Sequence, residues 1–231
     1  MSEQKLTWLP QNELSSRRAK LSLTKQALLE KRLRGEPANT SQSQVIVRAL
    51  RTEPLLLSYA QERLWFLHQL APTSPVYHIP LAVRLRGVLS AAQLAQVLDA
   101  LIQRHEALRT TFPLVAGQPV QHIAPHLSLP LPVLKLCNLP EAQRLAEARR
   151  LAASEAQQPF DLATGPLVRA TLLQLDSADH VLLLTLHHII ADGWSLGILF
   201  HDLAALSQSL ANDQPVSLPE LPLQYADYAV W

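Results

Sequence analysis

The chain is poor in cysteine, in aromatic residues and in long apolar runs. Cys137 is the single cysteine among 231 residues, which excludes an internal disulfide and a cysteine-rich metal site. No secretory signal is expected, because the N-terminal region has no long apolar core. No run approaches the roughly 20 apolar residues of a membrane span. These absences predict a protein of the reducing cytoplasm with no membrane partner.

The overall composition is that of a globular protein with a sizeable core, with 48% hydrophobic and 17% charged residues. Residues 1–51 carry ten Lys or Arg and four Asp or Glu, a net of +6, whereas residues 52–231 carry ten and fifteen, a net of −5. Such a basic arm is commonly a solvated linker, although it could dock an acidic protein partner. Because Trp8 is its only aromatic residue, nucleic acid is not expected as a partner.

The pattern divides the chain into two regions. Residues 1–52 are expected to be a basic linker or docking segment with one helix, whose apolar face carries Leu28, Leu29 and Leu33. Residues 53–231 alternate helices and strands, which predicts an α/β or α+β body. Helices are expected over residues 61–70, 90–108, 138–158 and 195–210, and strands over 76–85, 110–114, 120–123, 129–136, 167–175 and 180–188. Ser58 and Gln61 have the spacing of a capping box, and Ser90 and Asn138 are expected caps.

The segment His187-His188-Ile189-Ile190-Ala191-Asp192-Gly193 is the most informative in the chain. It follows the apolar strand Val181–Leu186, and adjacent strand side chains point to opposite faces, so the two histidines must diverge. A lone histidine on an apolar strand is usually a core residue, and His187 is expected to be structural. We expect His188 to be the last strand residue, where a neutral imidazole can accept a proton from an attacking amine or hydroxyl.

Asp192 and Gly193 are expected to form the turn into the next helix. An aspartate before a glycine is usually a surface turn residue, but a buried ion pair would fix its place. Arg104 and Arg109 are the two candidate partners. Gly193 permits close approach of another backbone, and the N–H groups that open the helix could stabilise an oxyanion.

Two other chemistries fit these residues less well. Histidines that diverge make poor joint ligands, so no metal site is expected. A Ser-His-Asp triad has no nucleophile elbow to support it. The residues therefore favour direct transfer without a covalent enzyme intermediate.

Four ordered motifs resemble those of the condensation domains of nonribosomal peptide synthetases, which belong to the chloramphenicol acetyltransferase-like superfamily. The motifs are Ser58–Leu67 (SYAQERLWFL), Arg104–Phe112 (RHEALRTTF), Leu186–Ser195 (LHHIIADGWS) and Tyr225–Trp231 (YADYAVW). The stretch Pro159–Leu162, followed by Gly165–Leu167, is also similar to a recurrent stretch of these domains. The resemblance implies an α/β (α+β) sandwich, a mixed sheet flanked by helices, in which residues 53–231 form the N-terminal lobe.

The resemblance implies an amide-forming acyltransferase of secondary metabolite and antibiotic biosynthesis. A carrier-bound aminoacyl amine would attack an upstream acyl or peptidyl thioester. His188, next to His187, would be the catalytic histidine, acting as a base or positioning the amine. Asp192 would be bridged to Arg109 or Arg104, and Gly193 would keep the channel open. The remaining motif and channel residues are Ser58, Gln61, Arg63, Trp194 and Ser195.

The resemblance also implies partners. Both substrates would arrive on phosphopantetheine arms of donor and acceptor carrier proteins, so the chain would bind no cofactor directly. The fourth motif lies near the midpoint of these two-lobed domains, so a C-terminal lobe or an adjoining adenylation domain is expected, and the isolated lobe could be inactive. Two alternatives stay open: a non-catalytic fragment or docking module of a synthetase, and a free-standing acyltransferase with the HHxxxDG motif.

Overall fold

The computed structural model describes residues 45–52, 54–211 and 218–231. Contacts divide the chain into two units, Met1–Val45 and Ile46–Trp231. The expected helix with Leu28, Leu29 and Leu33 lies outside the described residues.

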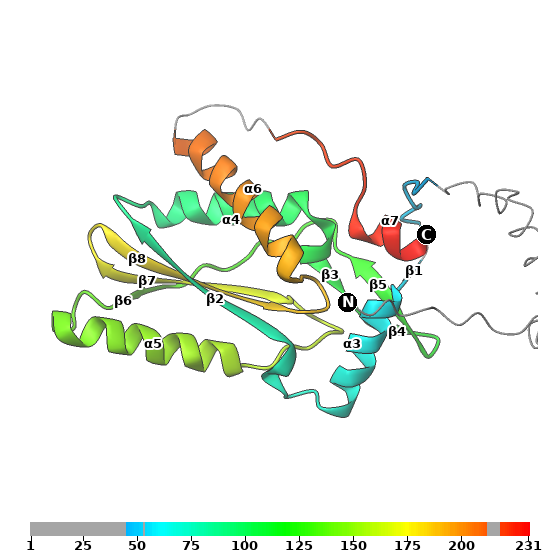
Figure 1. Cartoon of the computed structure of the whole chain (residues 1–231), viewed down its shortest axis with the longest axis horizontal. Helices are drawn as coiled ribbons and strands as arrows, with labels where there is room; N and C mark the ends of the chain where they lie inside the picture. Colours follow the sequence, from blue (N-terminus) through cyan, green and yellow to red (C-terminus); the bar gives the residue numbers. More distant parts are fainter. Residues whose placement is uncertain (1–44, 53, 212–217) are drawn as a thin grey trace, which may run out of the picture. The chain divides into compact units, whose positions relative to one another are not determined.

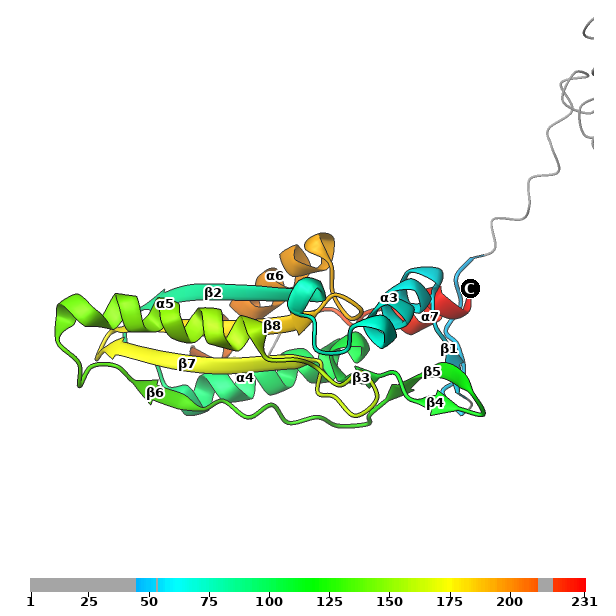
Figure 2. The same cartoon turned by 90° about the horizontal axis from the view of Figure 1, so that it is seen from below.

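A four-stranded mixed sheet organises the second unit (Figures 1 and 2). Its strands, in spatial order, are β2 (His78–Arg86), β8 (Asp179–His187), β7 (Val168–Asp176) and β6 (Val133–Lys135). β8 pairs antiparallel with both β2 and β7, whereas β6 runs parallel to β7. β7 and β8 form a hairpin, and only Ser177 and Ala178 separate the two strands. The expected mixed sheet flanked by helices is confirmed.

Helices cover both faces of this sheet, as Figure 1 shows. α4 (Ala91–Arg104) and α6 (Gly193–Ala211) lie on one face, and α5 (Glu141–Gln157) lies on the other. The side chains of β8 alternate between two cores. Leu182, Leu184 and Leu186 join the large core with the α4 and α6 leucines, whereas Leu183 joins a smaller core with Ala148 of α5. This alternation decides the direction of each histidine at the strand end.

The remaining elements are short helices, the helix α3 and a second, smaller sheet. The helices are α3 (Tyr59–Leu70), the short η1 (Pro75–Tyr77) and η2 (Glu106–Arg109), and α7 (Tyr225–Val230). The short strands are β1 (Leu55–Leu56), β3 (Thr110–Thr111), β4 (Leu114–Val115) and β5 (Gln118–Ile123), with β5 pairing antiparallel to the other three. The expected capping box is confirmed: Ser58 Oγ accepts the N–H of Gln61, and the Gln61 side chain accepts the N–H of Ser58.

Three local expectations were wrong. The helix predicted over residues 90–108 ends at Arg104, because His105 is extended (φ −104°, ψ 103°) before η2 begins. Asn138 does not cap α5, which begins at Glu141 after Pro140 without a side-chain cap. The strand predicted over residues 129–136 is reduced to Val133–Lys135, since prolines at 130 and 132 lack the N–H that a ladder needs.

None of the helices within the described residues combines the length and the hydropathy needed to cross a membrane.

Gly165 is expected to be intolerant of a side chain. Its φ is +62°, and an added Cβ would lie 2.7 Å from Cγ2 of Thr111. Gly117 has a similar φ of +80°, but its Cβ would meet no atom within 4 Å. Gly165→Ala should therefore lower the free energy of unfolding by about 1–3 kcal/mol more than Gly117→Ala, because only Gly165→Ala adds overpacking. Urea denaturation of both variants measures this difference, and equal losses would contradict the close contact.

Candidate active site

His187 is buried at the end of β8, with 1% of its surface exposed. Its Nδ1 accepts the N–H of Ile189 at 3.1 Å, so the ring shapes the turn that follows the strand. Four rings surround it, with centroid distances between 5.7 and 6.5 Å: His68, Tyr77, His78 and Phe160. His78 is in turn anchored to α5, since its Nδ1 lies 2.8 Å from the carbonyl of Ala156.

This environment keeps the His187 ring neutral. Burial, together with the neighbouring histidines His68, His78 and His188, lowers the pKa of His187 to about 3. Because Nδ1 is an acceptor, the proton of the neutral ring is on Nε2. A group with so low a pKa is a poor proton acceptor near neutrality, so the surroundings of His187 suit a structural role.

His188 is exposed, in contrast to its neighbour. The two histidines thus differ in burial, which is compatible with the predicted divergence of their side chains. β8 ends at His187, so His188 is the first residue of the turn rather than the last of the strand. Its backbone N–H donates to the carbonyl of Tyr77 at 2.8 Å, which fixes its main chain to the segment before β2. The structure thus presents this imidazole to solvent from an anchored backbone.

Asp192 caps α6. Its Oδ1 accepts the N–H and the hydroxyl of Ser195, each at 2.8 Å, and the Asp192 N–H donates to Ser195 Oγ at 2.7 Å. These bonds, chiefly the one from the Ser195 N–H, lower the pKa of the Asp192 carboxyl and keep it ionised. Since the Ser195 N–H is engaged with Asp192, it is not available as the oxyanion donor that the sequence suggested.

The expected ion pair of Asp192 with Arg109 or Arg104 is wrong. Asp192 is exposed at the start of α6, where Ser195 satisfies it locally. Arg104 pairs instead with Asp202, with 2.8 Å between Nε and Oδ2. Arg109 donates to the carbonyl of Ala124 and lies near Glu106. The Asp192 carboxylate already has its hydrogen-bond donors three residues further along the chain, as is usual for a helix N-cap. The two arginines are therefore engaged in other contacts.

Two other residues of the third motif and one of the first are accessible to solvent. A Cβ on Gly193 would meet no atom within 4 Å, so within the described residues no backbone approaches it closely. Trp194 is 84% exposed. Arg63, from the first motif, is also exposed. These three side-chain positions therefore face solvent.

Hydrogen bonds link the motifs to one another, and the first motif reaches the turn after β8. The Gln61 side chain donates to the carbonyl of Ile189 at 3.4 Å, linking the first motif to the third. Ser58 Oγ and the Tyr225 hydroxyl lie 2.9 Å apart, linking the first motif to the fourth. The N–H of Glu106 donates to Oε1 of Gln224 at 3.1 Å, which brings the second motif to the start of α7.

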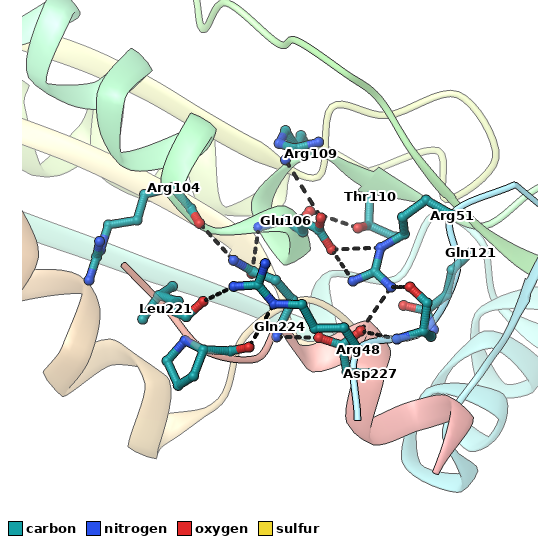
Figure 3. A network of polar contacts seen from close by, with 12 residues as sticks. Arg48, Arg51, Arg104, Glu106, Arg109, Thr110, Gln121, Leu221, Gln224 and Asp227 are labelled. Atoms are coloured by element: carbon teal, nitrogen blue, oxygen red, sulfur yellow. Dashed lines mark hydrogen bonds and ion pairs between the residues drawn. The ribbon is translucent and has the colours of Figure 1, made fainter. Parts of the chain in front are cut away.

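A polar network around the buried Asp227, which the sequence did not predict, ties the start of the unit to α7 (Figure 3). Arg51 contacts Asp227 at 2.8 Å and Glu106 at 2.7 Å. Asp227, with 1% of its surface exposed, also accepts the N–H groups of Ala49 and Gln224. Burial alone would raise the pKa of Asp227, but the bonds from Gln224, Arg51 and Ala49 lower it. Arg51 is an isolated basic residue in a linker-like stretch of the sequence, so no pattern there predicts this contact.

A pocket of about 380 Å³ lies on the His187 side of the site. α3 contributes Trp65, His68 and Gln69 to its lining, and residues 160–163 contribute another part. Since His68 and Phe160 also contact His187, this pocket adjoins the structural histidine; His188 is not among its lining residues. Across the part of the chain that the structure describes, no group of three or more potential ligands could hold a metal ion.

Solved structures with this arrangement are condensation-type domains. The X-domain from teicoplanin biosynthesis superimposes with a TM-score of 0.72 at 33% identity, over 80% of this chain and 39% of that one. The starter condensation domain of rhizomide synthetase RzmA gives a TM-score of 0.70 at 26% identity, over 77% of this chain and 43% of that one. The expected chloramphenicol acetyltransferase-like fold is confirmed.

Sequence comparison gives the family. The condensation-domain model matches residues 52–231. Phosphinothricin tripeptide synthetase PhsC of Streptomyces viridochromogenes is 44% identical over 95% of this chain, and malpibaldin synthetase of Mortierella alpina is 46% identical over 86% of it. The chain spans 20% and 4% of the lengths of these two relatives. The chain belongs to the condensation-domain family of nonribosomal peptide synthetases.

Asp192→Ala is expected to cost about 1 kcal/mol of unfolding free energy, the usual value for loss of a helix N-cap. Truncating one member of a buried ion pair would cost about 3–5 kcal/mol. Thermal or urea denaturation distinguishes the two values. Asp192→Ser, which retains a capping oxygen but no charge, is the matched control and should recover most of the loss. A loss in the larger range for both variants would contradict the local cap.

Acid should destabilise the chain through His187. The pKa of His187 is about 3 when folded, against about 6.5 in an unfolded chain. Between these values the unfolded chain binds a proton that the folded chain does not, so the free energy of unfolding falls as pH decreases. The fall from this one group approaches about 1.4 kcal/mol per pH unit.

His187→Asn isolates this contribution, because an amide oxygen can accept the Ile189 N–H without titrating. Urea denaturation of both proteins between pH 7 and about 4.5 should give a shallower slope for the variant. Parallel curves would show that His187 does not remain neutral in the folded chain.

Proposed function

We propose that this chain carries the histidine-bearing half of a condensation site, which joins an acyl or peptidyl thioester to an aminoacyl amine. The observation that supports this most directly is the environment of His188. Its imidazole is exposed on an anchored backbone, while the adjacent imidazole is buried and neutral. The site therefore offers one accessible imidazole, at the turn that follows β8.

In the proposed reaction the amine nitrogen attacks the thioester carbonyl carbon. A C–N bond forms, the C–S bond breaks, and the thiol of the donor arm leaves. The amine must lose a proton in this exchange, and the His188 imidazole is the group in the described site that can accept it or hold the amine in line. Because both substrates would be tethered, positioning alone can supply effective molarities of up to about 10⁵–10⁸ M.

The neighbouring residues support the placement of His188. The Ile189 N–H bonds to His187 on one side of the turn, and the Ile189 carbonyl accepts a bond from Gln61. The Asp192–Ser195 cap sets the start of α6 after the turn. Asp192 thus acts on the structure of the loop rather than on the substrates. The open position at Gly193 leaves room for a substrate arm beside the imidazole.

The partners proposed for this reaction are a donor and an acceptor carrier protein of the cytoplasm, each with a phosphopantetheine arm that delivers its substrate. A second lobe is proposed to complete the channel whose first wall includes Arg63 and Trp194. Support comes from the condensation-type structures, of which this chain covers 39% and 43%. A free-standing acyltransferase would instead accept acyl-CoA donors.

His188→Ala is expected to reduce amide formation by about 10²- to 10⁴-fold, the usual contribution of a positioned acid–base group. The assay uses this chain joined to the second lobe of a related condensation domain, with loaded donor and acceptor carrier proteins, and detects the product by mass spectrometry. His126→Ala, at another exposed histidine, is the control and should retain full activity.

Full turnover by the His188→Ala protein would reject the proposed role. Turnover of acyl-CoA donors in place of loaded carriers would favour the free-standing acyltransferase.

A further inference from the structure

Asp202 is a buried carboxylate near the middle of α6, with 4% of its surface exposed. Its Oδ2 accepts a bond from Nε of Arg104 at 2.8 Å and lies 2.9 Å from Nε2 of His105. Both partners belong to the second motif, where α4 ends and η2 begins. Asp202 therefore joins α6 to the second motif, which is the role that the sequence had assigned to Asp192.

The carboxylate is held in its ionised form. Burial by itself would raise the pKa of Asp202, but hydrogen bonds from Arg104 and His105 and their charge lower it. The side chains of Arg104 and His105 are 16% and 18% exposed, so the pair is largely shielded from water. Charge-assisted bonds of this kind are shorter and stronger than neutral ones, and they constrain direction as well as distance.

The apolar packing of α6 does not by itself fix the rotation or the axial position of the helix, so a directional contact is required. The buried face of the helix consists of leucines, including Leu199, Leu203 and Leu206, and apolar packing is non-directional. Asp202 is the only acidic residue of the helix. Among the hydrogen bonds of the described residues, those of Asp202 are the only ones that join an α6 side chain to another element. The leucines hold α6 on the sheet, and Asp202 sets its rotation and axial position.

The position of α6 bears directly on the site. The helix begins at Gly193, immediately after the turn that presents His188. The other side of the contact is equally anchored, since the carbonyl of Arg104 accepts a bond from Gln224. In Figure 3 the Arg104 side chain points away from the network around Arg51 and Asp227, so its guanidinium serves a separate contact.

We propose that Asp202 is a positioning residue for amide formation. By fixing α6 to Arg104 and His105, it keeps the turn after β8, and with it the His188 imidazole, in the place the reaction needs. This inference rests on the proposed function of His188, and it adds a residue outside all four motifs.

Asp202→Asn tests the proposal in the two-lobed protein described above. The substitution keeps the size of the side chain but removes its charge, so kcat should fall about 10- to 100-fold, as expected for a displacement near 1 Å. KM for the loaded acceptor should stay within about twofold, because the substrate contacts are unchanged. Asp202→Glu, which restores the charge, should recover part of kcat.

Glu155→Gln is the matched control. Glu155 is also a carboxylate with an arginine partner, 16% exposed against 5% for Asp202, and it pairs with Arg169 at 2.6 Å on the α5 side of the sheet. Its loss should also lower the melting temperature but leave kcat unchanged. If Asp202→Asn retains kcat, or if Glu155→Gln loses as much, the positioning role is overturned.

A second readout is independent of turnover. The imidazole signals of His188 in ¹H–¹⁵N spectra of this chain should shift in Asp202→Asn and not in Glu155→Gln. Unchanged His188 signals in Asp202→Asn would reject the inference, whatever the assay gives. Shifted signals in a protein whose wild type forms no amide would support the positioning of His188 while rejecting the proposed reaction.

Discussion

The alternation of side chains along β8 is the constraint on which the rest of the site depends. Leu182, Leu184 and Leu186 are committed to the α4 and α6 face by the large core, so the odd-numbered positions must face α5. His187 lies on the α5 side and is buried, whereas His188 is the first residue of the turn and is exposed. A shift of one residue in the pairing of β8 would turn the three leucines away from the large core and move His187 out of its buried environment. The packing of the core therefore fixes the orientation of His187, although the core residues take no part in the chemistry.

Much of the fold was predictable from the sequence because its signals are local. Ser58 and Gln61 lie one helical turn apart and define a cap within four residues. The apolar run before His187 is a strand by its length and its β-branched and leucine content, and its hairpin partner lies directly before it in the sequence. The predictions that were wrong concern the ends of helices and strands. Prolines at 130 and 132 shorten a strand, and the extended backbone of His105 ends α4 before its apolar pattern ends.

The site was only partly predictable because ion pairing depends on tertiary register. Asp192 could be recognised as a turn residue, but its partner Ser195 was attributed only to the channel. The carboxylate that pairs with Arg104 is determined by the axial position of α6 relative to α4. No spacing of residues in the sequence predicts that position. The one available signal was Asp202 itself, a single acidic residue among the leucines of a helix. Such a residue, when buried, needs a partner of opposite charge.

The network in Figure 3 has a mechanical consequence. Arg48 and Arg51, where the chain enters the unit, bind the carbonyls of residues 221 and 222 and the carboxylate of Asp227. Tension applied along the backbone from residue 46 therefore reaches α7 before it reaches any strand of the large sheet. The entry segment and the last helix form one joint, so a pull on the chain at this point must break the Arg51–Asp227 ion pair before the two ends of the unit can separate.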